Sequence, residues 1–150
     1  MNHWLMKSEP DVYSIDDLER DGREMWDSIR NYQARNMMRD EMKTGDKVFF
    51  YHSACEEPGI VGIAKVAGKP YPDPTAFDPK DKHFDAKSDP DNPRWVLVDV
   101  KYVRKLKRTI SLSELKEHKA LSEMVLVRRG NRLSIMPVSK GDWDYILALE

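Results

Sequence analysis

The chain has 150 residues, of which 25 are Lys or Arg and 26 are Asp or Glu, so its formal net charge is −1. This length suits a single domain, and 40% hydrophobic residues suffice for one core, which excludes a wholly disordered chain. The charge balance excludes a protein that coats DNA through general basicity, but it leaves room for a local basic patch.

Several other classes also lack support in the sequence. The longest apolar run, Tyr145 to Leu149, is too short to cross a bilayer, and the N-terminus has no long apolar segment of a secretory signal. The single cysteine, Cys55, cannot form an internal disulfide, which favours a reducing compartment. The four histidines are scattered without zinc-site spacing. We therefore expect a cytoplasmic protein without membrane contact, metal or other cofactor.

The N-terminal segment predicts a strand followed by a helix. Residues 4–7 favour a short strand that ends before Pro10, because proline cannot donate to a strand ladder. Ser14 and Asp17 have the spacing of a capping box at the start of a helix, and Gly22 ends that helix.

A second helix and two strands are expected next. Asn31 is a candidate cap for a helix over residues 32–42. Residues 47–52 and 60–66 read as two strands that pair as a hairpin. Gly62, within the second strand, indicates a bulge or a close contact with its backbone.

Residues 70–93 are rich in proline and aspartate, which predicts a long irregular loop. Loops of this length inside compact domains are often functional. The loop also contains three aromatic residues that we expect to pin it to the body of the domain, Tyr71, Phe77 and Phe84.

The C-terminal part again mixes strands and helices. The expected elements are a strand over residues 95–106, a helix opened by a capping box of Ser111 and Glu114, an ambiguous segment over residues 121–127, an edge strand over residues 132–138, and a helix opened by a capping box of Ser139 and Asp142. This grouping predicts an α+β domain with a small, curved or barrel-like mixed sheet and peripheral helices.

Residues 25–36 combine aromatic rings with amide and guanidinium groups. Aromatic faces stack on bases, and amide or guanidinium groups bind base edges, so this mixture suits a pocket for a planar, polar ligand. The alternative is that Trp26 and Tyr32 are core residues beside a solvated helix start. Both interpretations are compatible with the composition of the segment.

A second candidate position is the end of the strand over residues 47–52. Strand ends that open into loops commonly line sites, but Tyr51 and His52 point to opposite faces. His52 and Cys55 form only a weak nucleophile pair, and no known hydrolase, zinc-protease or phosphate-loop motif is present. The sequence therefore favours a protein that is not an enzyme.

The segment from residue 101 to 108 contains five basic residues and no acidic one. A smaller basic cluster consists of Arg128, Arg129 and Arg132. Such residues either form a stripe that contacts phosphates or protect an exposed strand edge against aggregation. The candidate phosphate contacts are Lys101, Arg104, Lys105, Lys107 and Arg108.

Several segments together resemble the EVE domain family, and they follow in order over nearly the whole chain. They are residues 4–10 (WLMKSEP), 26–36 (WDSIRNYQARN), 50–53 (FYHS), 59–64 (GIVGIA), 71–77 (YPDPTAF), 93–95 (PRW), 128–130 (RRG) and 137–139 (PVS). The sequence looks like a stand-alone bacterial EVE protein. The resemblance implies a PUA-like fold and kinship with YTH domains, which hold a methylated RNA base in an aromatic cage. For the EVE family it implies a reader of modified bases, foremost modified cytosine in DNA.

The resemblance also implies roles at single positions. Lys7 and Ser8 are similar to a Lys-Ser pair that lines the base pocket of YTH domains, and Trp26 is similar to their cage tryptophan. Asp27 stands where those domains have a small polar residue. The remaining cage walls come from a variable segment that corresponds to residues 70–93, where the likeness ends. The candidates for a second pocket wall are its aromatic residues, Tyr71, Phe77 and Phe84.

The resulting hypothesis is a non-catalytic reader of modified DNA or RNA. A modified base would leave its stack and lie on Trp26, while Ser8, Asp27, Asn31 or a backbone group binds its edge. A carboxylate suits the exocyclic amine of cytosine. Two alternatives remain: a sensor of a small molecule or modified nucleoside, and an enzyme that acts on a modified base through Asp27 or His52. The candidate ligand-binding residues are Lys7, Ser8, Trp26, Asp27, Asn31, Tyr32, Tyr51 and His52.

Overall fold

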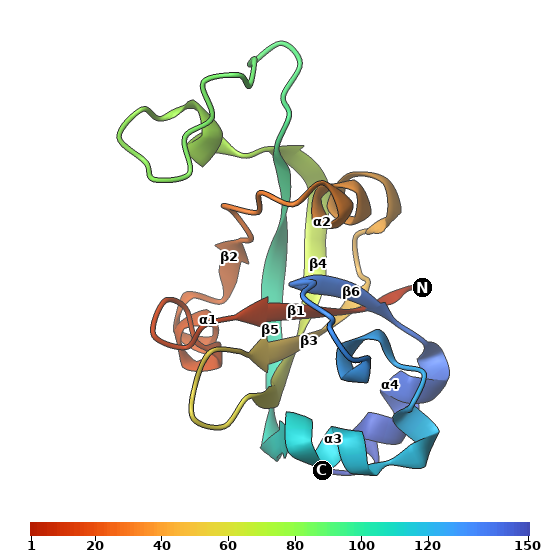
Figure 1. Cartoon of the computed structure of the whole chain (residues 1–150). Helices are drawn as coiled ribbons and strands as arrows, with labels where there is room; N and C mark the ends of the chain where they lie inside the picture. The colour runs from red at the N-terminus through yellow and green to blue at the C-terminus, as the bar shows by residue number, and fades with distance from the viewer.

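A computed structural model describes all residues, 1–150, and contains six strands and four α-helices (Figure 1). The strands are β1 (His3–Ser8), β2 (Arg23–Met25), β3 (Lys47–His52), β4 (Gly59–Pro72), β5 (Val96–Ser111) and β6 (Ile135–Val138). The α-helices are α1 (Ile15–Asp21), α2 (Tyr32–Asn36), α3 (Leu112–Glu117) and α4 (Lys140–Leu147). A π-helix covers Met37–Glu41, and 3-10 turns cover Pro74–Phe77, Lys119–Leu121 and Val125–Val127. No helix is both long and apolar enough to cross a membrane.

All six strands form one mixed sheet in the order β2-β5-β4-β3-β1-β6. β1 runs parallel to β3, and every other neighbouring pair is antiparallel. The predicted α+β class is therefore confirmed. β2 and β6 are the two edges, so the sheet is open, and the predicted edge position of the strand that contains Pro137 is also confirmed.

The sheet buries side chains on both of its faces. Alternation along β1 directs Trp4 and Met6 into one core cluster, with α1 and α2, and Leu5 into another, with α3 and α4. β3 divides in the same way, with Phe50 in the first cluster and Phe49 in the second. This two-sided burial explains why both strands read as continuous apolar runs.

Gly62 lies where the β4 backbone contacts helix α1. The register of β4 against β5 shifts between Ile60 and Gly62, which confirms the predicted irregularity. A Cβ atom at Gly62 would lie only 2.5 Å from Cδ1 of buried Ile15 and 3.1 Å from the carbonyl oxygen of Arg104. The absence of a side chain at this position therefore lets α1 pack directly on the sheet.

The structure corrects the extent of several predicted elements. β4 and β5 are longer than residues 60–66 and 95–106, because the two strands pair with each other from Gly59 opposite Ser111 to Pro72 opposite Val96. The expected loop therefore starts after Pro72, and Figure 1 shows it standing away from the body. The helix expected over residues 32–42 changes into a π-helix at Met37.

Smaller differences occur at the C-terminal elements and at the helix caps. The last strand begins only at Ile135, and residues 121–127 contain parts of two 3-10 turns. The capping box of Ser14 and Asp17 is confirmed in full. Ser111 and Ser139 each cap a helix, but the reciprocal half of both predicted boxes is wrong. Glu114 binds Arg108 at 2.7 Å instead of turning back to the cap.

Gly62→Ala should destabilise the fold by about 1–3 kcal/mol, because the added methyl group has to displace Ile15 within a filled core. Urea unfolding followed by tryptophan fluorescence measures this change. Gly141→Ala is the matched control, since nothing lies within 4 Å of a Cβ atom there and alanine favours helix α4. Equal stability of the two variants would contradict the close packing of α1 on Gly62.

Candidate functional site

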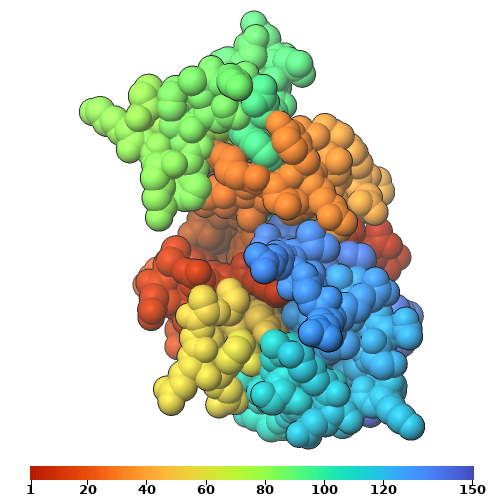
Figure 2. Space-filling model, viewed as in Figure 1, coloured from red at the N-terminus to blue at the C-terminus, as the bar shows by residue number.

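A cavity of about 690 Å³ lies between five segments. Figure 2 shows the hollow between the red N-terminal segment, the orange segment after β2, the green loop and the blue segment before β6. The lining residues are Lys7, Ser8, Glu9, Val12, Tyr13, Glu24, Met25, Trp26, Asp27, Ser28, Ile29, Ser53, Lys82, His83, Arg132, Leu133 and Ser134.

Backbone hydrogen bonds join these walls to the sheet. The N–H of Lys7 donates to the carbonyl of Ser134 at 2.8 Å, and the N–H of Ser53 donates to the carbonyl of Ser8 at 3.0 Å. The N–H of Trp26 donates to the carbonyl of Val98 at 2.9 Å, which fixes the chain just after β2. Each of these bonds lies just beyond a paired stretch of two strands and continues that pairing into the cavity wall.

Trp26 belongs to both the core and the cavity. Its side chain is only 7% exposed, lies in the core cluster that contains α1 and α2, and meets Phe50 edge-on at 5.5 Å between ring centroids. It also lines the cavity. Trp26 is therefore a core residue that also borders the hollow, and its role as a surface for a planar ligand stays a prediction.

Asp27 presents a carboxylate with few partners of its own. Its only hydrogen bond within the chain comes from the hydroxyl of Ser28, at 3.3 Å. Burial, and next the negative charge of Asp73, raise the pKa of Asp27 above its usual value. Ser28 has a φ of 66°, a left-handed conformation that is uncommon for residues other than glycine. Its N–H donates to Asp73 at 2.7 Å, which holds this turn.

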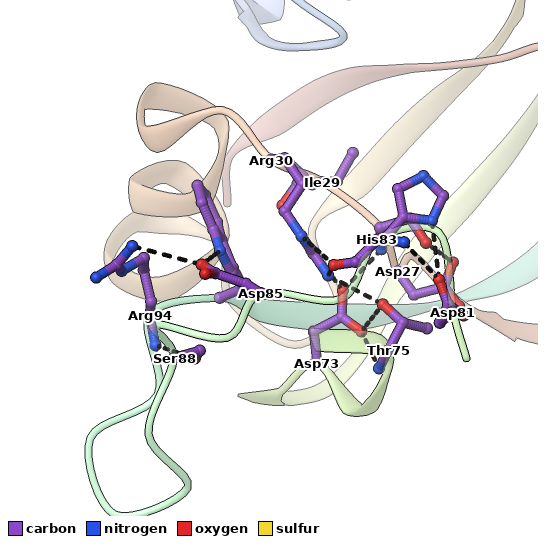
Figure 3. A network of polar contacts seen from close by, with 12 residues as sticks. Asp27, Ile29, Arg30, Asp73, Thr75, Asp81, His83, Asp85, Ser88 and Arg94 are labelled. Atoms are coloured by element: carbon purple, nitrogen blue, oxygen red, sulfur yellow. Dashed lines mark hydrogen bonds and ion pairs between the residues drawn. The ribbon is translucent and has the colours of Figure 1, made fainter. Parts of the chain in front are cut away.

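Arg30 connects the segment after β2, which lines the cavity, to the loop that follows β4 (Figure 3). Its guanidinium binds the buried carboxylate of Asp73 at 3.1 Å, the hydroxyl of Thr75 at 3.1 Å, and the carbonyl of His83 at 2.8 and 3.0 Å. Burial would raise the pKa of Asp73, but hydrogen bonds from Thr75, Ser28 and Arg30 outweigh it and lower that pKa. The network places His83 and its neighbour Lys82 on the cavity wall.

The predicted residues Lys7 and Ser8 both line the cavity. The ammonium of Lys7 lies 5.6 Å from the ring centroid of Tyr51, and burial lowers the pKa of Lys7. The hydroxyl of Ser8 donates to the carbonyl of Tyr13 at 2.5 Å and so closes the turn after β1. Ser8 thus shapes the wall, and its hydroxyl hydrogen is already used in this hydrogen bond.

The other four candidate ligand residues do not line the cavity. Asn31 caps α2 by accepting from the N–H of Ala34, and Tyr51 is buried in the core cluster with α3 and α4. Nε2 of His52 accepts from the N–H of Ile15 at 3.1 Å. Tyr32 is 52% exposed and stacks on Trp95 outside the hollow, at 4.8 Å between centroids.

The loop contributes polar side chains to the cavity in place of the expected aromatic ones. The hydroxyl of Tyr71 donates to Asp99 at 2.6 Å, and Phe84 is 41% exposed. Neither residue lines the cavity, nor does Phe77. Sequence reasoning missed Lys82 and His83, because they reach the hollow through contacts between distant residues, such as those of Arg30 with the carbonyl of His83. Nothing in the local sequence around Lys82 and His83 indicates that they line a cavity.

The five candidate phosphate contacts lie on β5, and none of them lines the cavity. Arg104 pairs with Glu150 at 2.7 Å and Arg108 pairs with Glu114 at 2.7 Å. Lys105 pairs with Asp16 and Glu19 of the α1 region. The ammonium groups of the two remaining members, Lys101 and Lys107, form no ion pair, although the backbone N–H of Lys107 donates to Glu150 at 3.1 Å. No group of three or more His, Cys, Asp or Glu side chains is arranged to hold a metal ion.

Comparisons with known proteins give one consistent family. The EVE domain model matches residues 2–149. The chain is 46% identical to human thymocyte nuclear protein 1 over 99% of this chain and 74% of that protein. A Pseudomonas syringae structure matches with a TM-score of 0.93 and 50% identity, over 98% of both chains. The structure of human THYN1 protein in complex with DNA containing 5-methylcytosine matches with a TM-score of 0.93 and 46% identity, over 99% of this chain and 97% of that one.

Arg30→Lys should loosen the loop without removing the positive charge, because a lysine cannot bind Asp73, Thr75 and the carbonyl of His83 together. We expect trypsin to cleave after Lys80, Lys82 or Lys87 about tenfold faster, which corresponds to about 1.4 kcal/mol of easier local opening. Arg39→Lys is the control, since Arg39 pairs only with its neighbour Asp40. Unchanged cleavage of Arg30→Lys would show that the loop is held by other contacts.

Proposed function

Since the chain belongs to the EVE domain family, we propose that it reads modified cytosine in DNA by taking the flipped base into the cavity beside Trp26 and Asp27. One observation carries this proposal: a rigid indole ring and a nearly unpartnered carboxylate border the same hollow. The likeness to human THYN1 bound to DNA containing 5-methylcytosine supports DNA and cytosine over other ligands.

The size and lining of the cavity suit one extruded base. Its volume of about 690 Å³ lies within the usual range for small-ligand sites, roughly 300–1,000 Å³. Stacking of a base on an aromatic side chain contributes roughly 1–3 kcal/mol. Apolar side chains at the same wall offer a surface for a 5-methyl group, namely Val12, Met25, Ile29 and Leu133.

Asp27 gives the site a means to choose cytosine over thymine. Both 5-methylcytosine and thymine carry the methyl group, so an apolar contact cannot separate them. They differ at position 4, where cytosine has an amine that donates and thymine has an oxygen that accepts. The Asp27 carboxylate accepts from the amine and repels the oxygen. We assign the base selectivity of the site to this side chain.

We further propose that the protein binds the base without chemical change. Nε2 of His52, which a general base would use, already accepts from the backbone N–H of Ile15.

We also propose a cytoplasmic location, because a reducing compartment suits the free thiol of Cys55.

Asp27→Ala should weaken binding of a duplex with one 5-methylcytosine by about tenfold to a hundredfold, because a hydrogen bond to a charged group contributes roughly 1.5–3 kcal/mol. Fluorescence anisotropy of a labelled duplex measures the affinity, and duplexes with cytosine or thymine at the same position measure the selectivity. We expect the loss of affinity to be largest for the cytosine bases. A variant that keeps full preference for 5-methylcytosine over thymine would overturn the assignment to Asp27.

The pH dependence of binding tests the same group in the wild-type protein. The pKa of Asp27 is raised, so its carboxylate becomes protonated at a higher pH than an ordinary aspartate, and affinity should fall as pH drops through that raised pKa. Asp27→Asn keeps an acceptor oxygen but does not titrate, so its affinity should vary less with pH. Parallel curves for the two proteins over the whole pH range in which both stay folded would exclude Asp27 as the titrating contact.

A further inference from the structure

The basic stretch on β5 is largely neutralised inside the molecule. Arg104, Lys105 and Arg108 each have a carboxylate partner from another element. Arg104 and Arg108 bind their partners through two guanidinium nitrogens each, which is the strongest geometry for such pairs. Contact with a phosphate would require these pairs to break, so β5 is poorly suited to bind DNA.

A second set of basic side chains lies on the segment that leads into the cavity wall at Arg132. Arg128, Arg129 and Arg132, which we call the arginine rim, are all exposed, and none has a carboxylate within ion-pair distance. Arg132 itself lines the cavity. The one hydrogen bond of the rim side chains runs from Arg128 to the carbonyl of Glu123 at 3.0 Å.

The rim is held in place by backbone contacts. The N–H of Asn131 donates to the carbonyl of Arg128 at 3.2 Å, and its side-chain oxygen accepts from the N–H of Leu133 at 3.0 Å. Ser134, just beyond, accepts from the N–H of Lys7 on β1. Figure 2 shows this blue segment directly bordering the hollow. Arg132 therefore lies on the cavity wall with a fixed backbone, and Arg128 and Arg129 precede it by four and three residues, with no carboxylate paired to their guanidinium groups.

We propose that the arginine rim binds the DNA phosphates that flank the base held in the cavity; this inference rests on the proposed function. A base that leaves its stack stays attached to its backbone, so its two flanking phosphates must lie at the mouth of the cavity. Arginine binds phosphate through two parallel hydrogen bonds. Lys82, exposed and without an ion pair on the loop opposite, extends the positive charge to the other side of the mouth.

The charges of the cavity wall support a division of roles between rim and interior. The wall has three basic residues and three carboxylates, so the cavity by itself is close to neutral. Arg128 and Arg129, which lie outside the lining, add positive charge that no carboxylate offsets. The interior thus suits the amine of a neutral base, and the rim suits the charged backbone that brings it.

The decisive variants are Arg129→Gln and the double variant Arg128→Gln with Arg129→Gln, because neither residue lines the cavity. Affinity for a duplex with one 5-methylcytosine is measured between 50 and 200 mM salt. Each lost phosphate contact should lower the slope of log affinity against log salt by about 0.9 and weaken binding about threefold to tenfold. Lys107→Gln is the matched control: it removes one charge from the β5 stretch without breaking an ion pair.

Binding of free 5-methyl-2′-deoxycytidine separates the rim from the cavity, because this nucleoside has no phosphate. The rim variants should bind it as the wild type does. An unchanged salt slope in the rim variants, or an equal loss in Lys107→Gln, would overturn the arginine rim. A wild type that binds methylated and unmethylated duplexes equally and ignores the nucleoside would overturn the proposed function instead, while its salt slopes would still decide the role of the rim.

Discussion

The buried carboxylate of Asp73 holds the candidate site together. It accepts hydrogen bonds from the backbone of Ser28 at 2.7 Å, from both the N–H and the hydroxyl of Thr75 at 2.8 and 2.7 Å, and from Arg30 at 3.1 Å. These donors come from two segments more than 40 residues apart in the sequence. A buried charge is tolerated only when its oxygens are satisfied in this way, so the turn at Ser28 and the start of the loop stabilise each other. The position of Asp27 and the loop wall of the cavity both follow from that one group.

Local patterns predicted most of the fold because alternation and capping are local properties. The runs at β1 and β3 and the serine caps of α1, α3 and α4 needed no knowledge of distant contacts. Features that depend on pairing between distant strands were not predicted. β2 has only three residues and exists because it pairs with β5, and the full lengths of β4 and β5 come from their register with each other.

The candidate site likewise contains residues that local sequence predicts and residues that only distant contacts bring to it. Trp26 and Asp27 were found because the family resemblance marks them in a contiguous segment, and both lie at the cavity. Lys82 and His83 could not be predicted, since they reach the hollow through contacts between distant residues, among them those of Arg30 with the carbonyl of His83. The expectation of an aromatic second wall in the loop comes from the resemblance to YTH domains. In this chain, the loop offers a lysine and a histidine to the cavity, while Tyr71 binds Asp99 on β5.

The side chains that line the cavity determine how strongly the proposed site can distinguish 5-methylcytosine from cytosine and thymine. A single methyl group buried against Val12, Met25 or Leu133 contributes about 0.8 kcal/mol, or about fourfold in affinity. If Asp27 binds position 4 of the base as proposed, it faces a larger difference, because the thymine oxygen there cannot donate the hydrogen bond that the cytosine amine supplies. On the proposed function, the site rejects thymine more strongly than unmethylated cytosine. Phosphate contacts at the proposed arginine rim would raise the affinity for all three bases equally, so they would add binding strength without altering that order.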